Sequence, residues 1–358
     1  MAILFGVCVS ISTYLKPKPS HDECAKDSGH YQESASKIGQ GNDMPPTPVR
    51  YTSHSDDEAK IVSLFNATSG KSFDVPQWTW SYRENPDRKT FRCLAYDGDR
   101  LVSHSAAVPV RILADGKPFL ASRIQNVMSD PEYRGQGIFF QTLDRLTHQL
   151  MDSGEQIVIT YPNDNSLHTF IGKLEYRHLF DISVYASEAG SLRSRTDARY
   201  RSTVSDELQV ADDDLSLISS HLSSYRVFTN RTKVYLQWRF DRRYGQNYRA
   251  VRIFAGTKQI GLIIAKMFGG NAVDLVEIFV APEALPFAIS EAVKSFGPQI
   301  STVDAWLMPH YKYYRAMREL GFSPSTLRSH VVYKSLTGLD IPLDKEALYL
   351  SMSDSDVF

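Results

Sequence analysis

The segment from Asn126 to Phe140, NVMSDPEYRGQGIFF, constrains the fold of this chain more than any other. A strand-like run leads into a proline-marked turn, and a bend that contains Gly135 and Gly137 then opens a helix. The first backbone N–H groups of a helix have no intrahelical partner and lie at the positive end of the helix dipole, so they attract an anion. The segment therefore predicts a phosphate-binding loop, with Arg134 at the helix entrance as a further positive charge.

The residues after the bend predict an alternation of helices and strands. Apolar residues recur at helical spacing, and Gly154 ends the helix. The apolar stripe consists of Phe139, Leu143, Leu146 and Leu150. A buried strand over 156–161, a capped turn over 162–166 and a second helix up to about 172 follow. A plain tight turn before a helix is the alternative interpretation of the two glycines. The order of elements favours the binding loop.

A family resemblance rests on this stretch. The run RGQGIF, Arg134 to Phe139, resembles the (Gln/Arg)-x-x-Gly-x-(Gly/Ala) motif of the GNAT acyltransferases, with Phe139 in the place of Gly or Ala. The resemblance implies that the loop holds the pyrophosphate of acetyl-CoA and that the strand before it pairs with the pantetheine arm. The acetyl-CoA-binding residues that it implies are Val127, Met128, Arg134, Gly135, Gln136, Gly137, Ile138 and Asn163. The RGxGIF form also resembles GNAT proteins of bacterial polysaccharide and surface-sugar pathways.

The chain repeats itself. Trp80 aligns without gaps with Trp238, and the same offset aligns Tyr96 with Phe254. Tryptophans at strand edges are ordinary core residues, so a chance match is the alternative interpretation. Several matching positions in the same order favour a duplication. Together with the resemblance, the repeat predicts an α/β (α+β) fold of two tandem GNAT-like domains, each a mixed twisted sheet flanked by helices.

We expect five segments, because 358 residues suit two domains and a polar stretch separates the repeats. They are a disordered or non-core segment (1–48), a catalytic GNAT domain (49–187), a linker (188–201), a degenerate GNAT-like domain (202–334) and a C-terminal strand and tail (335–358). The second domain is degenerate because its counterpart of the cofactor strand, 272–282, is followed by Glu-Ala-Leu-Pro instead of a glycine loop. One acetyl-CoA site per chain is therefore expected.

Composition limits the partners. Lys and Arg total 40 against 41 Asp and Glu, so no basic excess attracts nucleic acid or an anionic membrane. Cys8, Cys24 and Cys93 lack metal-ligand spacing, so we expect no metal and a reducing cytoplasm. The apolar run over 2–15 is too short to span a bilayer and has no positive flank, although a signal peptide or interfacial anchor is the alternative. No oligomeric state is predicted.

Acyl transfer to an amine usually employs a base and an acid. GNAT enzymes often place a tyrosine acid on the helix after the fifth strand, but here that position falls on Phe170 or Ile171. His168 on the same helix and Tyr161 at the strand end are the candidate catalytic residues, and His104 is a third. A solvated helix surface for His168 and a core aromatic role for Tyr161 are the alternatives. Proximity of the reactants could also suffice without a single acid.

The sequence thus predicts an acetyl-CoA-dependent N-acetyltransferase that acts on a small-molecule primary amine. An amino sugar or sugar nucleotide is the expected acceptor, from the RGxGIF resemblance alone. The rival is a non-catalytic acyl-CoA-binding or regulatory GNAT-like protein, favoured by the missing tyrosine and by the lack of Glu on the strand 119–128. A nucleotide-binding fold is a weaker alternative interpretation, because the chain lacks both the Walker lysine and the three-glycine fingerprint of dinucleotide-binding folds.

Overall fold

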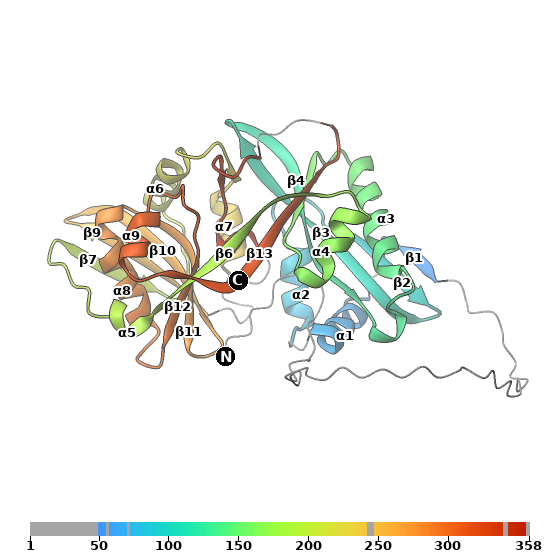
Figure 1. Ribbon diagram of the computed structural model, residues 1–358, viewed down its shortest axis with the longest axis horizontal. Helices are drawn as coiled ribbons and strands as arrows, with labels where there is room; N and C mark the ends of the chain where they lie inside the picture. Colours follow the sequence, from blue (N-terminus) through green and yellow to red (C-terminus); the bar gives the residue numbers. More distant parts are fainter. Residues whose placement is uncertain (1–48, 55–56, 70–71, 242–246, 339–342, 356–358) are drawn as a thin grey trace, which may run out of the picture.

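A computed structural model describes residues 49–54, 57–69, 72–241, 247–338 and 343–355. The expectations for residues 1–48, including those for Cys8 and Cys24, lie outside these ranges. Figure 1 shows two halves side by side, residues 49–188 and 189–355, each with strands flanked by helices. Within the described ranges, no helix combines the length and the apolar character that a bilayer crossing requires.

The two halves have similar orders of elements. The first half contains β1 (Arg50–Thr52), α1 (Glu58–Ser69), α2 (Val75–Tyr82), β2 (Phe91–Asp97), β3 (Arg100–Ala114), β4 (Lys117–Ser129), the 3-10 helix η1 (Pro131–Tyr133), α3 (Ile138–Asp152), β5 (Ile157–Thr160), α4 (Asp164–Gly172) and β6 (Arg177–Glu188). The second half begins with α5 (Ala189–Leu192), β7 (Tyr200–Ser205), α6 (Asp212–Leu222), β8 (Val227–Thr229) and α7 (Lys233–Arg239). It continues with β9 (Tyr248–Ala255), β10 (Lys258–Phe268), β11 (Ala272–Val280), η3 (Pro282–Ala284), α8 (Leu285–Ser295), β12 (Thr302–Trp306), α9 (Tyr314–Glu319), β13 (Ser323–Ser335), β14 (Leu348–Tyr349) and η4 (Met352–Asp354).

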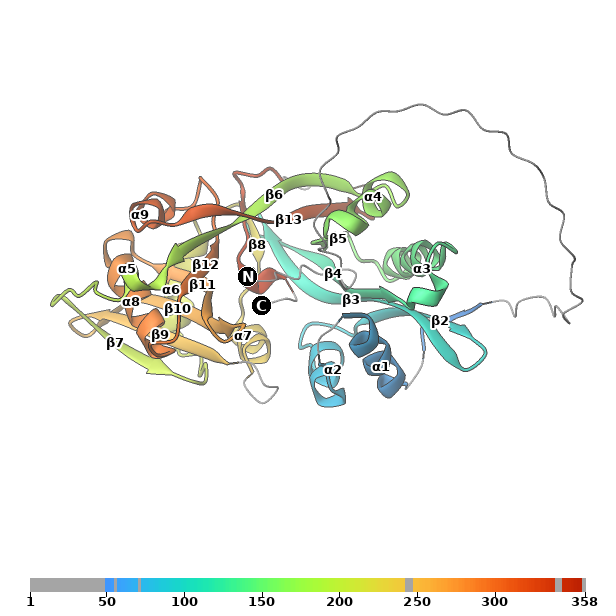
Figure 2. The ribbon, with the colours of Figure 1, turned by 60° about the horizontal axis from the view of Figure 1, so that its bottom comes forward.

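The halves exchange their last strands. The main sheet runs β1-β2-β3-β4-β5-β13-β6-β12-β11-β10-β9-β7, which reads the same from either end once each strand is exchanged for its repeat counterpart. β13 of the second half pairs with β5 of the first, and β6 of the first pairs with β12 of the second. Figure 2 shows β6 and β13 crossing together from one half to the other. If the chain is divided at the predicted boundaries, 49–187 and 202–334, one strand of each segment therefore pairs with a strand of the other segment. These strands are β6 and β13.

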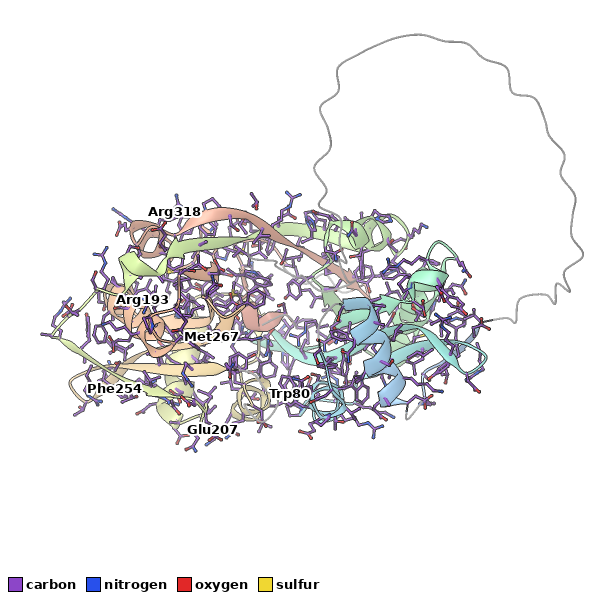
Figure 3. All side chains as sticks on the ribbon, turned by 90° about the horizontal axis from the view of Figure 1, so that it is seen from below. Trp80, Arg193, Glu207, Phe254, Met267 and Arg318 are labelled. Carbon is purple, nitrogen blue, oxygen red and sulfur yellow. The ribbon has the colours of Figure 1, made fainter. Side chains whose placement is uncertain are left out.

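The aligned tryptophans of the two repeats meet in space. Trp80 Nε1 donates to the carbonyl of Trp238 at 2.7 Å, and Trp238 Nε1 donates to the carbonyl of Trp80 at 2.9 Å. Their ring centroids lie 5.9 Å apart. Figure 3 labels Trp80 at this contact between the helices α2 and α7. The reciprocal bonds are what an approximate twofold relation between the repeats produces.

The predicted elements around the glycine bend are present. The apolar stripe of α3 is buried against the sheet, with Leu143, Leu146 and Leu150 fully covered. β5 lies within the predicted strand, and the Asn163 side chain caps α4 by accepting from the Ser166 N–H at 3.1 Å.

Two segments outside the predicted domains, the linker and the C-terminal tail, differ from expectation. The predicted linker contains α5, whose Ala189 and Leu192 are buried, because these two apolar residues pack toward α8. The expected C-terminal strand shortens to β14 and then turns into η4. Met352 and Asp354 of η4 are buried between the halves, so this tail belongs to the core.

Candidate functional site

The cleft of the first half forms where β4 and β5 separate. These parallel strands pair from Ala121 with Ile157 to Arg123 with Ile159, and β4 then continues to Ser129 beside β3 but without β5. One further contact, from Thr160 Oγ1 to the Ile124 carbonyl at 3.1 Å, closes the junction. Past this point, the backbone edge of β4 is available to an extended ligand, since the described strands offer it no partner on that side.

A bulge lies on β4 beside the cleft. The pairing with β3 shifts its register between His104 and Ala106, and Asn126 takes a φ of 50°. Such a bulge changes the direction of the backbone groups and side chains that follow it. Val127 consequently faces the α3 side of the sheet, and Met128 faces α1, where Thr68 contacts its sulfur. Figure 2 shows α1 and α2 on one side of these strands and α3 on the other.

His104 is bound to the bulge. Its Nδ1 lies 2.9 Å from the Asn126 carbonyl, which can only accept, so Nδ1 carries the proton. Its Nε2 has no hydrogen-bond partner among the described residues. Burial lowers the pKa of His104 to about 4, so the ring is neutral at pH 7. The Asn126 amide donates to the Tyr82 hydroxyl, which holds the other side of the bulge.

The glycine loop directly follows β4 and η1. Gly135 and Gly137 both have a φ of 78°, the left-handed region that glycine adopts without strain. Gly137 is the N-cap of α3 and makes no side-chain cap bond. The first N–H groups of α3, at Ile138, Phe139 and Phe140, therefore point out of the helix end without an intrahelical acceptor.

A pocket of about 310 Å³ lies between this helix end and α4. The loop and the start of α3 contribute Arg134, Gly135, Gly137 and Ile138 to its lining, together with Phe139 and Phe140. From α4 and its C-cap come Asn165, Ser166, His168, Thr169 and Lys173. The pocket thus combines free helix N–H groups with the cationic side chains Arg134 and Lys173, an arrangement suited to a phosphate-bearing ligand.

Four of the eight predicted cofactor residues meet in this pocket. They are Arg134, Gly135, Gly137 and Ile138. Gln136 turns its amide back to the Glu132 carbonyl, and Asn163 is used as the helix cap. Val127 and Met128 lie in the preceding strand, beside the cleft rather than in the pocket.

The two predicted catalytic residues lie in different surroundings. His168 is exposed and lines the pocket beside the glycine loop. Tyr161 follows β5 and is buried, with its ring 5.5 Å from that of Trp306. Desolvation raises the pKa of Tyr161 well above 10, so its hydroxyl remains protonated. The structure does not bring these two side chains into one pocket.

Sequence reasoning named His168 on α4 but missed the other residues that this helix and its C-cap contribute to the pocket. Asn165, Thr169 and Lys173 are spaced four apart, which puts them on one face of a helix. The spacing was a usable signal, because this helix was expected to follow the strand beside the loop.

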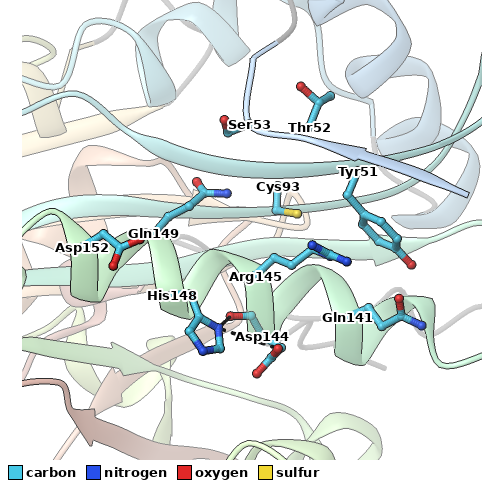
Figure 4. A pocket seen from close by; sticks show the side chains of 10 residues that line it. All are labelled: Tyr51, Thr52, Ser53, Cys93, Gln141, Asp144, Arg145, His148, Gln149 and Asp152. Atoms are coloured by element: carbon cyan, nitrogen blue, oxygen red, sulfur yellow. Dashed lines mark hydrogen bonds and ion pairs between the residues drawn. The ribbon is translucent and has the colours of Figure 1, made fainter.

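A second hollow, of about 490 Å³, lies between α3 and β1 (Figure 4). Its lining carries both signs of charge, with Arg145 between Asp144 and Asp152, and the Arg145 guanidinium stacks 4.5 Å over the Tyr51 ring. Cys93 lies at its base, and burial raises the pKa of this thiol to about 11. A thiol with so high a pKa is a poor nucleophile at neutral pH.

The second half lacks the features of the first-half pocket at the corresponding place. β11 leads into η3 and α8, where Pro286 stands in the first turn. Ala284 and Leu285 are fully buried at the start of this helix, where the first half has exposed glycines. Their side chains cover the backbone that would otherwise contact an anion.

Comparisons with known proteins agree with this architecture. Residues 49–179 match the sequence profile of the acetyltransferase (GNAT) domain. No curated protein sequence matches the chain. The first half of the chain is therefore a GNAT domain.

Solved structures share the fold of both halves. A GCN5-related N-acetyltransferase from Anabaena variabilis superposes with a TM-score of 0.62 at 14% identity, over 81% of this chain and 73% of that one. A tandem GNAT protein from the clavulanic acid biosynthesis pathway gives 0.57 at 11%, over 82% and 100%. N-myristoyltransferase from Saccharomyces cerevisiae, solved with bound myristoyl-CoA, gives 0.60 at 10%, over 83% and 81%. The chain as a whole therefore has a tandem GNAT fold.

Proposed function

We propose that this protein is an acetyl-CoA-dependent N-acetyltransferase whose active site lies in the first half. One observation carries the proposal: a glycine loop at an uncapped helix end directly follows a bulged strand that separates from its neighbour. The GNAT domain match over the same residues supports it.

In this proposal, acetyl-CoA lies along β4 and ends at α3. The N–H groups of Ile138 to Phe140 bind the pyrophosphate, and Arg134 and Lys173 add positive charge. The free edge of β4 at Val127 and Met128 pairs with the amide groups of the pantetheine arm. The thioester then lies beside the bulge at Asn126, where the strands separate.

For proton transfer we propose His168 or Tyr161. His168 has access to solvent, which a group that exchanges protons during turnover needs. Tyr161 remains protonated, so it suits an acid that gives its proton to the departing thiolate. His104 is proposed as a positioning residue, since its protonated nitrogen is engaged by the bulge carbonyl.

The proposed acceptor is a small-molecule primary amine, and an amino sugar or sugar nucleotide is its proposed class. The test is thiol release from acetyl-CoA with a panel of amino sugars, amino acids and polyamines, run beside direct titration with acetyl-CoA. Turnover that depends on the amine supports the proposal, and His168→Ala and Tyr161→Phe then assign the proton-transfer group.

A non-catalytic acyl-CoA-binding protein is the second candidate. The observation in its favour is that Phe170, at the expected tyrosine position, is fully buried in the core and carries no proton. Tight acetyl-CoA binding without turnover on any amine of the panel would establish this candidate instead.

A further inference from the structure

A cluster of metal-ligating side chains lies where the two halves exchange strands. His178 and Asp181 are on β6, and His330 is on the neighbouring strand β13, directly opposite Asp181. The ligand atoms of these three residues all lie within 4.8 Å of one another. His330 and Asp181 are 149 positions apart in the chain, so the sequence contains no local motif that predicts the cluster.

Asp181 lies between the two histidines. Its Oδ1 is 2.8 Å from His178 Nε2 and 2.6 Å from His330 Nδ1. The other oxygen, Oδ2, faces Arg328 at 3.6 Å, which leaves Oδ1 for the histidine side. Two imidazoles and one carboxylate thus converge on one point from two strands.

The surroundings of His330 point to a cation. Its second nitrogen, Nε2, lies 2.7 Å from Oδ1 of Asp164, at the first turn of α4. A neutral imidazole has a single N–H, so one of its nitrogens would direct a lone pair at a carboxylate oxygen. A metal ion bound by both His330 Nδ1 and Asp181, in place of the hydrogen bond that joins them, removes this conflict, because Nε2–H then donates to Asp164. Metal-bound histidines commonly have such an outer carboxylate partner.

We propose that His178, His330 and Asp181 bind a divalent transition-metal ion, with Zn²⁺ as the first choice. Imidazole and carboxylate are ligands that Zn²⁺ accepts, and three protein ligands leave a position for water. The His330 side chain is only 5% exposed, whereas that of His178 is 37% exposed, so the ion reaches the site from the His178 side.

Such an ion would link three elements that come from both halves. It joins β6 to β13 directly, and through His330 and Asp164 it holds the first turn of α4. The same helix lines the proposed cofactor pocket with Asn165, Ser166 and His168. The site therefore goes beyond the proposed acetyl transfer, and its presence does not depend on that reaction.

The test is a titration of the full-length, untagged protein with ZnCl₂ after removal of metal by a chelator. Calorimetry should show one Zn²⁺ per chain, and Co²⁺ should give visible absorption bands of a bound ion. His178→Gln and Asp181→Asn should abolish this binding. Asp164→Asn should weaken it by about tenfold, as expected for an outer partner of a ligand.

His148→Gln is the matched control, because His148 lies 3.7 Å from a single aspartate, Asp144, on the outer surface of α3. It should leave the zinc affinity unchanged. Absence of binding by the wild-type protein would overturn the proposal and leave the cluster as a hydrogen-bonded contact between β6, β13 and α4. Binding that persists in both His178→Gln and Asp181→Asn would overturn it as well. Because His178 is partly exposed, its replacement tests the site without removing a core residue.

Discussion

At the scale of single residues, two glycines at opposite ends of α3 separate a binding role from a folding role. Gly137 and Gly154 have φ values of 78° and 81°, and a Cβ at either position would meet no atom closer than 4.0 Å. We expect Gly137→Val to weaken acetyl-CoA binding by about tenfold or more, since its side chain covers N–H groups that bind the pyrophosphate. Calorimetric titration with acetyl-CoA measures the effect.

The control is Gly154→Val, which carries the same left-handed strain of about 1–2 kcal/mol but lies at the far end of the helix. It should lower the thermal stability about as much as Gly137→Val and leave the affinity for acetyl-CoA unchanged. Equal affinities for acetyl-CoA in the two variants would show that the glycine loop is not part of the cofactor site.

His104 gives a second prediction at this scale. His104→Asn keeps an N–H close to the place of Nδ1, whereas His104→Leu leaves the Asn126 carbonyl without its donor. If His104 positions the bulge, kcat of the Leu variant should fall by up to about a hundredfold, whereas the Asn variant should retain most of the wild-type kcat. The measurement is steady-state kinetics with the best amine of the panel. An equally large loss in both variants would instead indicate that the Nε2 lone pair takes part in the reaction.

At the scale of elements, β11 carries a buried acid. Asp274 is buried opposite Asp304 of β12, and one of its oxygens has no partner among the described residues. Burial, and then the charge of Asp304, raises the pKa of Asp274 to about 8. The native state therefore retains a proton between pH 4 and 8 that the unfolded state releases, so this residue lowers stability as the pH rises, by about 1.4 kcal/mol for each pH unit.

We expect Asp274→Asn to remove this loss, because the amide resembles the protonated acid and does not ionise. The free energy of unfolding of the variant, minus that of the wild type, should rise steadily between pH 5 and pH 8. Urea unfolding at several pH values measures the difference. A difference that does not change with pH would show that Asp274 has an ordinary pKa.

The elements also show what the sequence could predict. α3, β5 and the capped start of α4 follow from local signals, namely helical spacing, an apolar run and an asparagine cap. The pairing of β13 with β5 has no local signal, since the residues of neither strand indicate which half its neighbour comes from. The hydrophobic pattern of the sequence specifies which residues form a strand. Which of two equivalent strands it then pairs with depends on the packing of the whole chain. The ligand cluster at His330 was missed for the same reason.

At the scale of the whole molecule, buried charges tie the halves together. Arg231 pairs with Glu277 at 2.8 Å and with Asp354 at 2.7 Å, and all three side chains are nearly inaccessible to solvent. The Asp354 carbonyl accepts from Arg123 of β4, so the C-terminal segment joins the first half to this charged network of the second half. Removal of one partner from such a network leaves a buried charge that is strongly destabilising, by about 3–5 kcal/mol.

The strand exchange therefore predicts that neither repeat folds alone. A fragment ending at Ala198 lacks β13, so the edge of β5 is exposed and β6 has no neighbouring strand to pair with. We expect fragments 1–198 and 199–358 to show no cooperative thermal transition and no acetyl-CoA binding when they are purified separately. Refolding the two fragments together should restore both properties, since every strand then finds its partner.

The control is the full chain with a protease site inserted after Ala198. Cleavage there leaves all strand pairings in place, so the nicked protein should stay associated and keep its cofactor affinity. Cooperative unfolding and acetyl-CoA binding by fragment 1–198 alone would show that the first repeat closes its sheet without β13.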